Sequence, residues 1–338
     1  MKGLELSKRY YLEYGEPMLR TEFSSLLPLI AVGLAGSGSE CFGFDDTISQ
    51  DHDFEPGFCI FLPDEKTVDS RAAFALERAY AKLPKEFMGF SRAALDPVGG
   101  SRHGVIRTAD FFAAKTGRPD GQLSLREWCL TPEQALAEAT NGAVFYDGLG
   151  QFTAMRERLS YLPEDVRRKK LAGNLLLMGQ AGQYNYKRCI DRKETAAAQL
   201  AAIEFAKAAM QAIFLLNRVY LPYYKWSFRA LRDLPLLSDL APALEYLISS
   251  GNEDPAEKQA ILEQVCEEII AACRAQGLTR YAGAEAEGQA YAVNQTVADT
   301  ELRNLHILYA TEKRKTKFGR PQLGNNRFKT AHFGANLR

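Results

Sequence analysis

Two aspartates one residue apart follow a turn rich in glycine and serine. Residues 36–53 read GSGSECFGFDDTISQDHD, and the aspartates are Asp51 and Asp53. Residues two positions apart on a β-strand point to the same face, so we expect these two carboxylates to project together from a strand. Two hard oxygen donors side by side favour Mg²⁺, with Mn²⁺ as an alternative, and such an ion also binds phosphate groups.

The turn itself has the residues needed to hold phosphates. We expect the backbone of Gly36, the hydroxyls of Ser37 and Ser39, and the positive end of a following helix to bind a triphosphate. A P-loop is excluded because its lysine is missing, and a dinucleotide-binding turn is excluded because Cys41 occupies the place of its third glycine. The alternative is an ordinary glycine turn followed by solvated aspartates. The order strand, turn, aspartate pair favours phosphate chemistry, in which two metal ions about 4 Å apart clamp the reacting oxygens.

Alternating strands and helices in the first half of the chain must position these groups. The apolar patterns predict strands at 29–36, 51–62, 104–108 and 142–147, and helices at 4–14, 17–26, 68–83 and 130–140. This pattern indicates an α/β (α+β) domain with a small mixed sheet over residues 1–150.

From residue 151 onward the pattern is almost entirely helical. Long segments with few breakers predict an all-α helical bundle over residues 151–311, with a central apolar helix beginning near residue 195. The remaining residues, 312–338, contain eight Lys or Arg and one acid, which predicts a solvated basic tail; a polyanion contact is the alternative.

The overall composition limits the classes of partner. The 338 residues carry a formal net charge of zero, which argues against bulk electrostatic binding of nucleic acid or of an anionic membrane. The six cysteines form no CxxC pair, so we expect reduced thiols without zinc. The chain has no run of 18 apolar residues and no apolar core near its N-terminus, so we expect a cytoplasmic protein. The oligomeric state is left open.

The stretches G36-S37 and D51-H52-D53 resemble the signature of the polymerase-beta-like nucleotidyltransferase superfamily, which includes the antibiotic nucleotidyltransferases. More narrowly, segments such as GQYNYKRC and LPYYKW resemble a branch known as the domain of unknown function 4037, over roughly residues 25–235. The resemblance implies a nucleotidyltransferase-like α/β domain followed by a helical bundle that helps form the acceptor site. It also implies transfer of a nucleoside monophosphate from an NTP, with ATP expected, to a hydroxyl of an unknown small molecule or protein, releasing pyrophosphate.

The sequence departs from that superfamily at two places. Many members read S-D-x-D, whereas one residue is inserted here between Ser49 and Asp51. A third carboxylate is expected on a later strand, but residues 105–108 contain none; Asp110 and Asp147 are the candidates, and the choice between them is open. Without a general base, worth typically about 10²–10⁴-fold in rate, the chain would be a weak enzyme or a nucleotide-binding regulatory module.

Two further segments could contribute to a site. Lys225 and Tyr224 lie in PYYKW, where a lysine among aromatic residues could contact a phosphate or a base; an anchor packed on the core is the alternative. Tyr186 and Lys187 interrupt a helical pattern and are expected to face the substrate, with a surface loop as the alternative. A third hypothesis is a helical partner-binding protein, in which the first domain serves as a scaffold.

Overall fold

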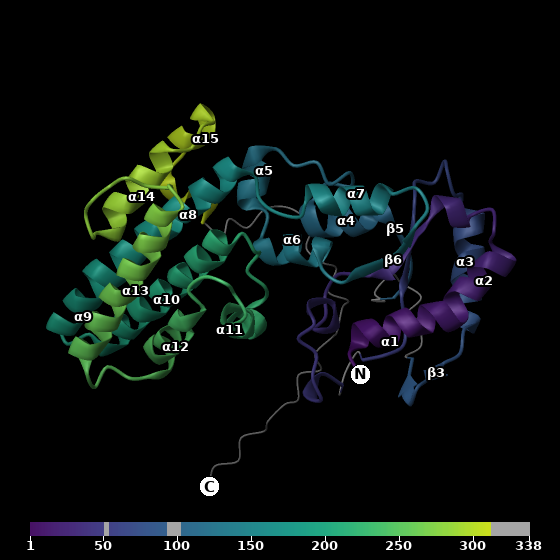
Figure 1. The fold of residues 1–338 in the computed structure, drawn as a ribbon, viewed down its shortest axis with the longest axis horizontal. Coiled ribbons are helices and arrows are strands. Elements are labelled where there is room, and N and C mark those ends of the chain that lie inside the picture. The colour runs from purple at the N-terminus through teal and green to yellow at the C-terminus, as the bar shows by residue number, and fades with distance from the viewer. Residues whose placement is uncertain (51–53, 93–102, 312–338) are drawn as a thin grey trace, which may run out of the picture.

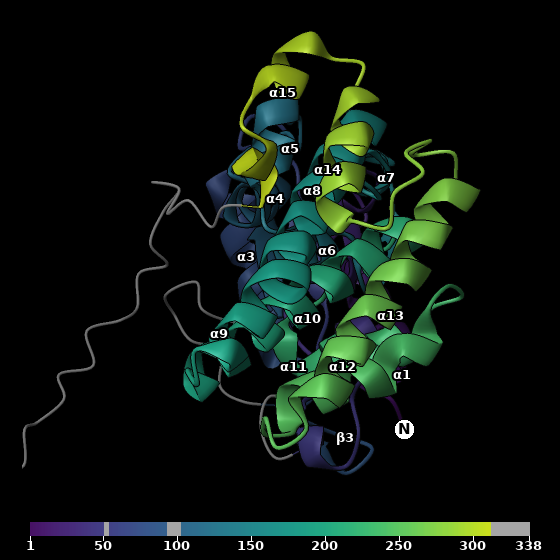
Figure 2. The same ribbon diagram turned by 90° about the vertical axis from the view of Figure 1, so that its left-hand side faces the viewer.

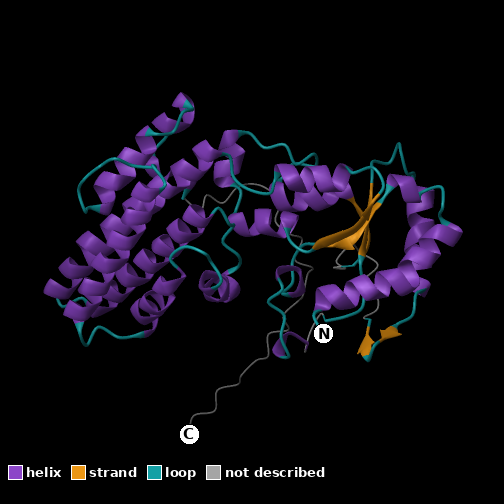
Figure 3. Ribbon diagram, viewed as in Figure 1, coloured by secondary structure: helices purple, strands orange, loops and turns teal. Residues whose placement is uncertain are grey.

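The computed structural model describes residues 1–50, 54–92 and 103–311 (Figure 1). Asp51, Asp53 and the basic segment 312–338 lie outside the described residues. A small sheet with helices on both faces is followed along the chain by helices alone, and Figure 3 shows how small the sheet is beside them. The expected combination of a small mixed sheet with many helices is confirmed.

The main sheet has four strands in the order β5-β2-β1-β6. They are β1 (Ala31–Leu34), β2 (Cys59–Leu62), β5 (Gly104–Arg107) and β6 (Ala143–Asp147). Strand β2 pairs with β5 in parallel, whereas β1 is antiparallel to both β2 and β6. A separate hairpin joins β3 (Glu86–Phe87) to β4 (Phe90–Ser91).

A long N-terminal helix covers one face of this sheet. It runs through α1 (Gly3–Tyr10), a π-helical turn (Tyr11–Gly15) and α2 (Glu16–Glu22) without a break. The expected stop near Gly15 is wrong. Pro17 falls in the first turn of α2, where its missing N–H is tolerated, and Gly15 allows the helix to approach the ring of Phe58. The long helix and α3 (Ser70–Lys82) bury a core that includes Tyr10, Phe58 and Tyr80.

On the other face, α4 (Thr108–Thr116) contacts β5 and α7 (Gln151–Arg158) contacts β6. Helix α6 (Glu133–Thr140) packs on α4 and α7, and α5 (Leu125–Leu130) packs against the bundle that follows. Phe61 of β2 stacks on Phe152 of α7 with ring centroids 3.9 Å apart, and Phe111 of α4 meets Phe61 edge-on. Burying each of these rings contributes roughly 1.5–3 kcal/mol to folding, which fixes α4 and α7 on the sheet.

The rest of the chain forms a helical bundle (Figures 1 and 2). Its elements are α8 (Glu164–Met178), a second π-helical segment (Gly179–Tyr186), α9 (Lys187–Asp191), α10 (Thr195–Asn217), α11 (Tyr224–Arg232), α12 (Ala241–Ser249), α13 (Pro255–Ala275), α14 (Ala286–Gln295) and α15 (Thr300–Asn304). Helix α10 packs against α8, α12 and α13, and its Phe205 and Ile213 are fully buried, as expected for a central helix.

The bundle and the sheet share one apolar core. Buried residues form a continuous cluster that extends from Phe61 and Phe152, through Leu171 of α8, to Phe214 of α10 and Ile269 of α13. The apolar core therefore includes residues from both sides of position 150. The domain boundary expected at that position stays a prediction.

Among the described helices, α10 is long and apolar enough to cross a membrane by length and composition. Most of its apolar window, 61%, is buried inside the protein, and core helices of soluble proteins pass the same test.

Candidate functional site

The glycine-serine turn begins directly after β1. Gly36 and Gly38 adopt φ values of +118° and +125°, which side chains rarely tolerate, so the local sequence requires glycine at both positions. Ser37 is exposed and Ser39 half-buried. The helix that follows is a single 3₁₀ turn, Glu40–Phe42. It is too short to supply a useful dipole, so the expected contribution from the positive end of a helix is wrong.

Asn141 fixes the turn to the loop between α6 and β6. Its side-chain oxygen accepts from the Gly36 N–H at 2.8 Å, and its side-chain amide donates to the Gly36 carbonyl at 2.7 Å. The next residue, Gly142, donates its N–H to the carbonyl of Cys41 at 2.8 Å. The Gly36 N–H is therefore already bonded within the protein. Donors for a phosphate have to come from positions 37–39 of the turn.

The strand register decides which segments meet at the turn. Gly33 of β1 pairs with Cys59 of β2 in antiparallel orientation, so β2 begins at the sheet edge where the turn follows β1. The expected strand over 51–62 is shorter than predicted. It begins only at Cys59, after Pro56, which has no N–H to donate to a ladder. The expectation that Asp51 and Asp53 share a face rested on their lying in this strand, and both are outside the described residues.

The two candidates for the third carboxylate lie at the other end of the strands. Asp147 pairs with Ala31, the first residue of β1, and its side chain accepts a hydrogen bond from the Thr153 N–H at 2.8 Å. Asp110 is exposed in the first turn of α4, which starts where β5 ends, level with Leu62. The strand register therefore argues against both residues as partners of the turn.

Helix α11 approaches the segment just after the turn. The rings of Phe44 and Trp226 are 5.7 Å apart, and Arg229 donates to the Phe44 carbonyl at 2.6 Å. Arg229 also lies 3.3 Å from a carboxylate oxygen of Asp46. Lys225 is exposed, with its Nζ 5.0 Å from the Trp226 ring centroid. The predicted PYYKW segment is thus brought next to residues 42–46.

Tyr224 offers an aromatic surface beside this contact. Its side chain is 75% exposed, and its ring lies 4.3 Å from that of Tyr223. An exposed ring pair of this kind can stack on a planar ligand. Sequence reasoning found Lys225 and Tyr224 but missed Arg229, which the amphipathic pattern of α11 could have suggested.

Tyr186 and Lys187 do not approach the turn. Tyr186 is 1% exposed and donates its hydroxyl hydrogen to Asn252 at 3.0 Å, and burial raises its pKa to about 12. Lys187 pairs with Asp191 at 2.9 Å on α9, at the end of the bundle far from the sheet (Figure 1). The π-helical segment places both residues in the bundle, away from the turn, and their role on the substrate side stays a prediction.

Arg156 of α7 is a charged residue that sequence reasoning missed. One terminal nitrogen, Nη2, donates to the Thr140 carbonyl at 2.8 Å, while the other, Nη1, is buried with no hydrogen-bond partner in the described part of the chain. Burial lowers the pKa of Arg156, with a smaller opposing effect from Cys41 nearby. Nothing in the local sequence pattern singles it out.

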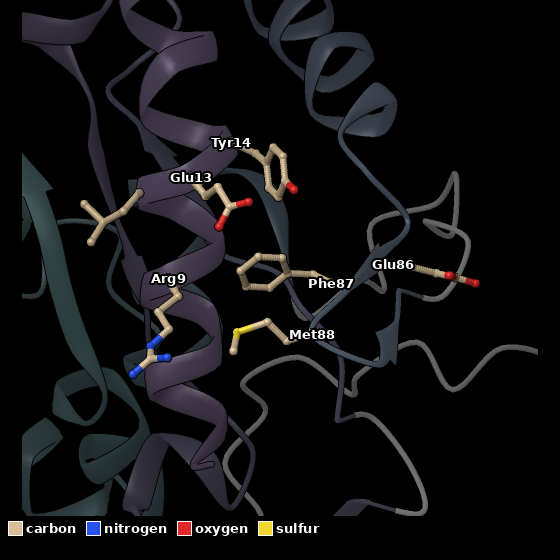
Figure 4. Close-up of a pocket in the computed structure, with 7 residues that line it drawn as sticks. Arg9, Glu13, Tyr14, Glu86, Phe87 and Met88 are labelled. Carbon is tan, nitrogen blue, oxygen red and sulfur yellow. The ribbon is translucent and has the colours of Figure 1, made fainter.

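Other grooves in the described part of the chain lie away from the turn. One, of about 680 Å³, opens between the N-terminal helix and the β3–β4 hairpin (Figure 4) and is lined by Arg9, Leu12, Glu13, Tyr14, Glu86, Phe87 and Met88. Another, of about 800 Å³, surrounds Glu164, whose carboxylate pairs with Arg167, Arg168 and Arg218 at 2.7, 3.0 and 2.8 Å. None of the expected site residues lines either groove.

A metal ion would depend on the acidic pair. Within residues 1–50, 54–92 and 103–311 no group of three His, Cys, Asp or Glu side chains could hold one. Carboxylates are suitable ligands for Mg²⁺, but Asp51 and Asp53 would have to supply them.

Part of the chain described above matches a known family. Residues 128–227 match the family described as Domain of unknown function (DUF4037). This confirms the resemblance to DUF4037 over that part of the chain. The DUF4037 match includes Asn141, Arg156 and Lys225 and ends within α11, whereas the turn at 36–39 precedes it. No curated protein matches the chain.

Proposed function

We propose that the protein is a magnesium-dependent nucleotidyltransferase that moves a nucleoside monophosphate from an NTP to a hydroxyl group and releases pyrophosphate. The observation that carries the proposal is the antiparallel pairing of β1 and β2 through Gly33 and Cys59. Because of this pairing, a turn suited to phosphates and the chain entering β2 from the acidic pair meet at one sheet edge. That arrangement suits a polyphosphate with its metal ions.

The residues have separate roles in this proposal. Ser37, Ser39 and the backbone of the turn hold the β- and γ-phosphates, while Asn141 keeps the turn in shape through Gly36. Asp51 and Asp53 would hold Mg²⁺, which supplies charge neutralisation for the phosphates. Helix α11 contacts Phe44 just after the turn, and its Tyr224 and Lys225 offer a stacking surface and a positive charge to a base or an acceptor.

One observation favours a second candidate, a nucleotide-binding module with little or no turnover. Asp110 and Asp147 both lie at the end of the strands away from the turn. If no other group removes the proton of the acceptor hydroxyl, binding can persist while the rate falls by about 10²–10⁴-fold.

Calorimetry and pyrophosphate release separate these candidates. Each NTP is titrated into the protein with Mg²⁺, and pyrophosphate release is then followed with a panel of hydroxyl acceptors and by the mass of the protein itself. The variants are Asp51→Asn and Asp53→Asn. The control is Asp64→Asn, which alters a carboxylate that accepts from the Thr67 N–H just after β2.

The expected outcome is metal-dependent NTP binding and pyrophosphate release that both Asp51→Asn and Asp53→Asn abolish and Asp64→Asn retains. Binding without release would favour the module. A wild-type protein that binds no NTP would refute both candidates and leave the scaffold hypothesis.

A further inference from the structure

Arg156 is a half-buried cation with one buried donor, Nη1, that has no hydrogen-bond partner among the described residues. Leaving a buried guanidinium donor without an acceptor costs free energy, so a ligand oxygen that reaches Nη1 would stabilise the site. The donor is therefore suited to a ligand oxygen.

The position of Arg156 relates it directly to the turn. Its Nη2 donates to the carbonyl of Thr140, the last residue of α6. The next residue, Asn141, makes both of the hydrogen bonds to Gly36. The guanidinium is thus hydrogen-bonded to the residue directly before Asn141, whose side chain holds the turn in place.

The packing around Arg156 holds it on the face of the sheet that α4 and α7 contact. Its guanidinium carbon lies 5.6 Å from the ring centroid of Phe152, which stacks on Phe61 of β2. The neighbouring ring of Phe111 lies 3.7 Å from the place where a side chain on Gly36 would begin. The contact with Phe152 restricts the rotamers of the arginine, which reduces the entropy lost when a ligand binds.

We propose that Arg156 binds the terminal phosphates of the NTP, and afterwards the pyrophosphate, through the vacant Nη1 donor. The inference rests on the proposed function and adds to it a specific residue for the leaving group. A planar guanidinium with two adjacent nitrogens suits phosphate oxygens better than a lysine does. Arg156 therefore favours ligands that carry a di- or triphosphate over monophosphates.

Calorimetry with Mg²⁺ and three probes, ATP, inorganic pyrophosphate and AMP, tests this assignment. The variants are Arg156→Gln, which removes the charge, and Arg156→Lys, which retains the charge but loses the planar fork. The control is Arg158→Gln on the same helix, where the exposed Arg158 donates to the Asp120 carbonyl at 3.2 Å. Circular dichroism establishes which variants are folded.

Arg156→Gln should weaken ATP and pyrophosphate binding by about 10- to 100-fold while changing AMP binding less than about twofold, since a charge-assisted hydrogen bond is lost. The ATP and pyrophosphate affinities of Arg156→Lys should lie between those of Arg156→Gln and the wild type. Arg158→Gln should bind all three probes as the wild type does. If Arg156→Gln does not fold, Arg156→Lys decides the question by the same ratio of pyrophosphate to AMP affinity.

Wild-type ATP binding that is unchanged in the folded Arg156 variants, or weakened equally for AMP, would overturn the role of Arg156 and leave the proposed function intact. A wild-type protein that binds neither ATP nor pyrophosphate would overturn both.

Discussion

The side chain of Asn141 makes two hydrogen bonds to the backbone of Gly36, a residue 105 positions earlier in the chain. One amide group thus satisfies both the N–H and the carbonyl of the residue that opens the turn. The loop before β6 therefore sets the shape of the turn after β1, and a change in the DUF4037 segment can alter a site that lies outside it.

Asn141→Ala should lower the free energy of unfolding by about 1–3 kcal/mol, because two half-buried backbone groups of Gly36 lose their partner. It should also weaken NTP binding, since the turn would no longer be held. The control is Asn252→Ala, which removes hydrogen bonds to Tyr186 and Thr195 in the bundle. Urea denaturation and calorimetry should show similar destabilisation in both variants and weaker NTP binding in Asn141→Ala alone. Equal NTP affinities in Asn141→Ala and Asn252→Ala would contradict the role of Asn141 in holding the turn.

Gly142→Ala should be far more damaging than Gly43→Ala, although both glycines have similar positive φ values of +67° and +70°. A side chain at Gly142 would begin 1.9 Å from the Leu34 carbonyl oxygen, whereas nothing lies within 4 Å of the same position at Gly43. The shared conformational cost is roughly 1–2 kcal/mol, and the steric overlap at Gly142 adds about 1–3 kcal/mol or more. Urea midpoints measure the difference, and equal midpoints would argue against the close contact between β1 and the loop before β6.

Arg229→Ala should loosen the segment between the turn and the acidic pair. Arg229 donates to the Phe44 carbonyl and approaches Asp46, so its loss frees that segment from α11. Hydrogen exchange of the amides at 42–49 should become faster than in the wild type. The control is Arg232→Ala, because Arg232 pairs with Glu245 within the bundle. Exchange that speeds up equally in both variants would show that general destabilisation, and not the lost contact, is the cause.

Lowering the pH should reduce the stability of the folded protein partly because Glu164 becomes protonated. Burial raises the pKa of this carboxyl, but hydrogen bonds and charges from Arg167, Arg168 and Arg218 outweigh burial and lower it to about 2. The folded-state pKa lies below the unfolded one, so this stabilisation is complete above about pH 4.5 and is lost as the pH falls towards 2.

The melting temperature of Glu164→Gln should therefore lie below that of the wild type at pH 6, and the difference should shrink steadily between pH 4.5 and pH 2. The comparison variant is Glu267→Gln, which alters an exposed position on α13. A difference between wild type and Glu164→Gln that is independent of pH would contradict the ion-pair explanation.

Local patterns predicted most of the secondary structure. The apolar runs gave β1, β5 and β6 within a few residues, and the predicted helix over 68–83 corresponds to α3, capped by Asp69. Patterns failed where a residue had a tertiary role. The sequence predicts a helix stop near Gly15, but this glycine lies inside a continuous helix, where the ring of Phe58 packs against it.

The same distinction between local pattern and tertiary contact applies to the residues of the candidate site. Residue type and order alone identified the turn at 36–39, the acidic pair and the PYYKW segment, because their chemistry is local. The partners of the turn could not be found this way. Asn141 bonds to Gly36 from the loop after α6, and Arg156 bonds to the neighbouring Thr140, whereas Tyr186 lies in the π-helical segment of the bundle.

By itself, the sequence determined most of the helices and strands and singled out the glycine-serine turn as a candidate phosphate site, since both depend on neighbouring residues and their spacing. Tertiary structure alone decided that Asp147 lies at the end of the strands away from the turn, that Gly36 already has a bonding partner, and that Nη1 of Arg156 is buried without a partner among the described residues. These facts depend on strand register and on packing between segments far apart in the chain, and no local spacing encodes them.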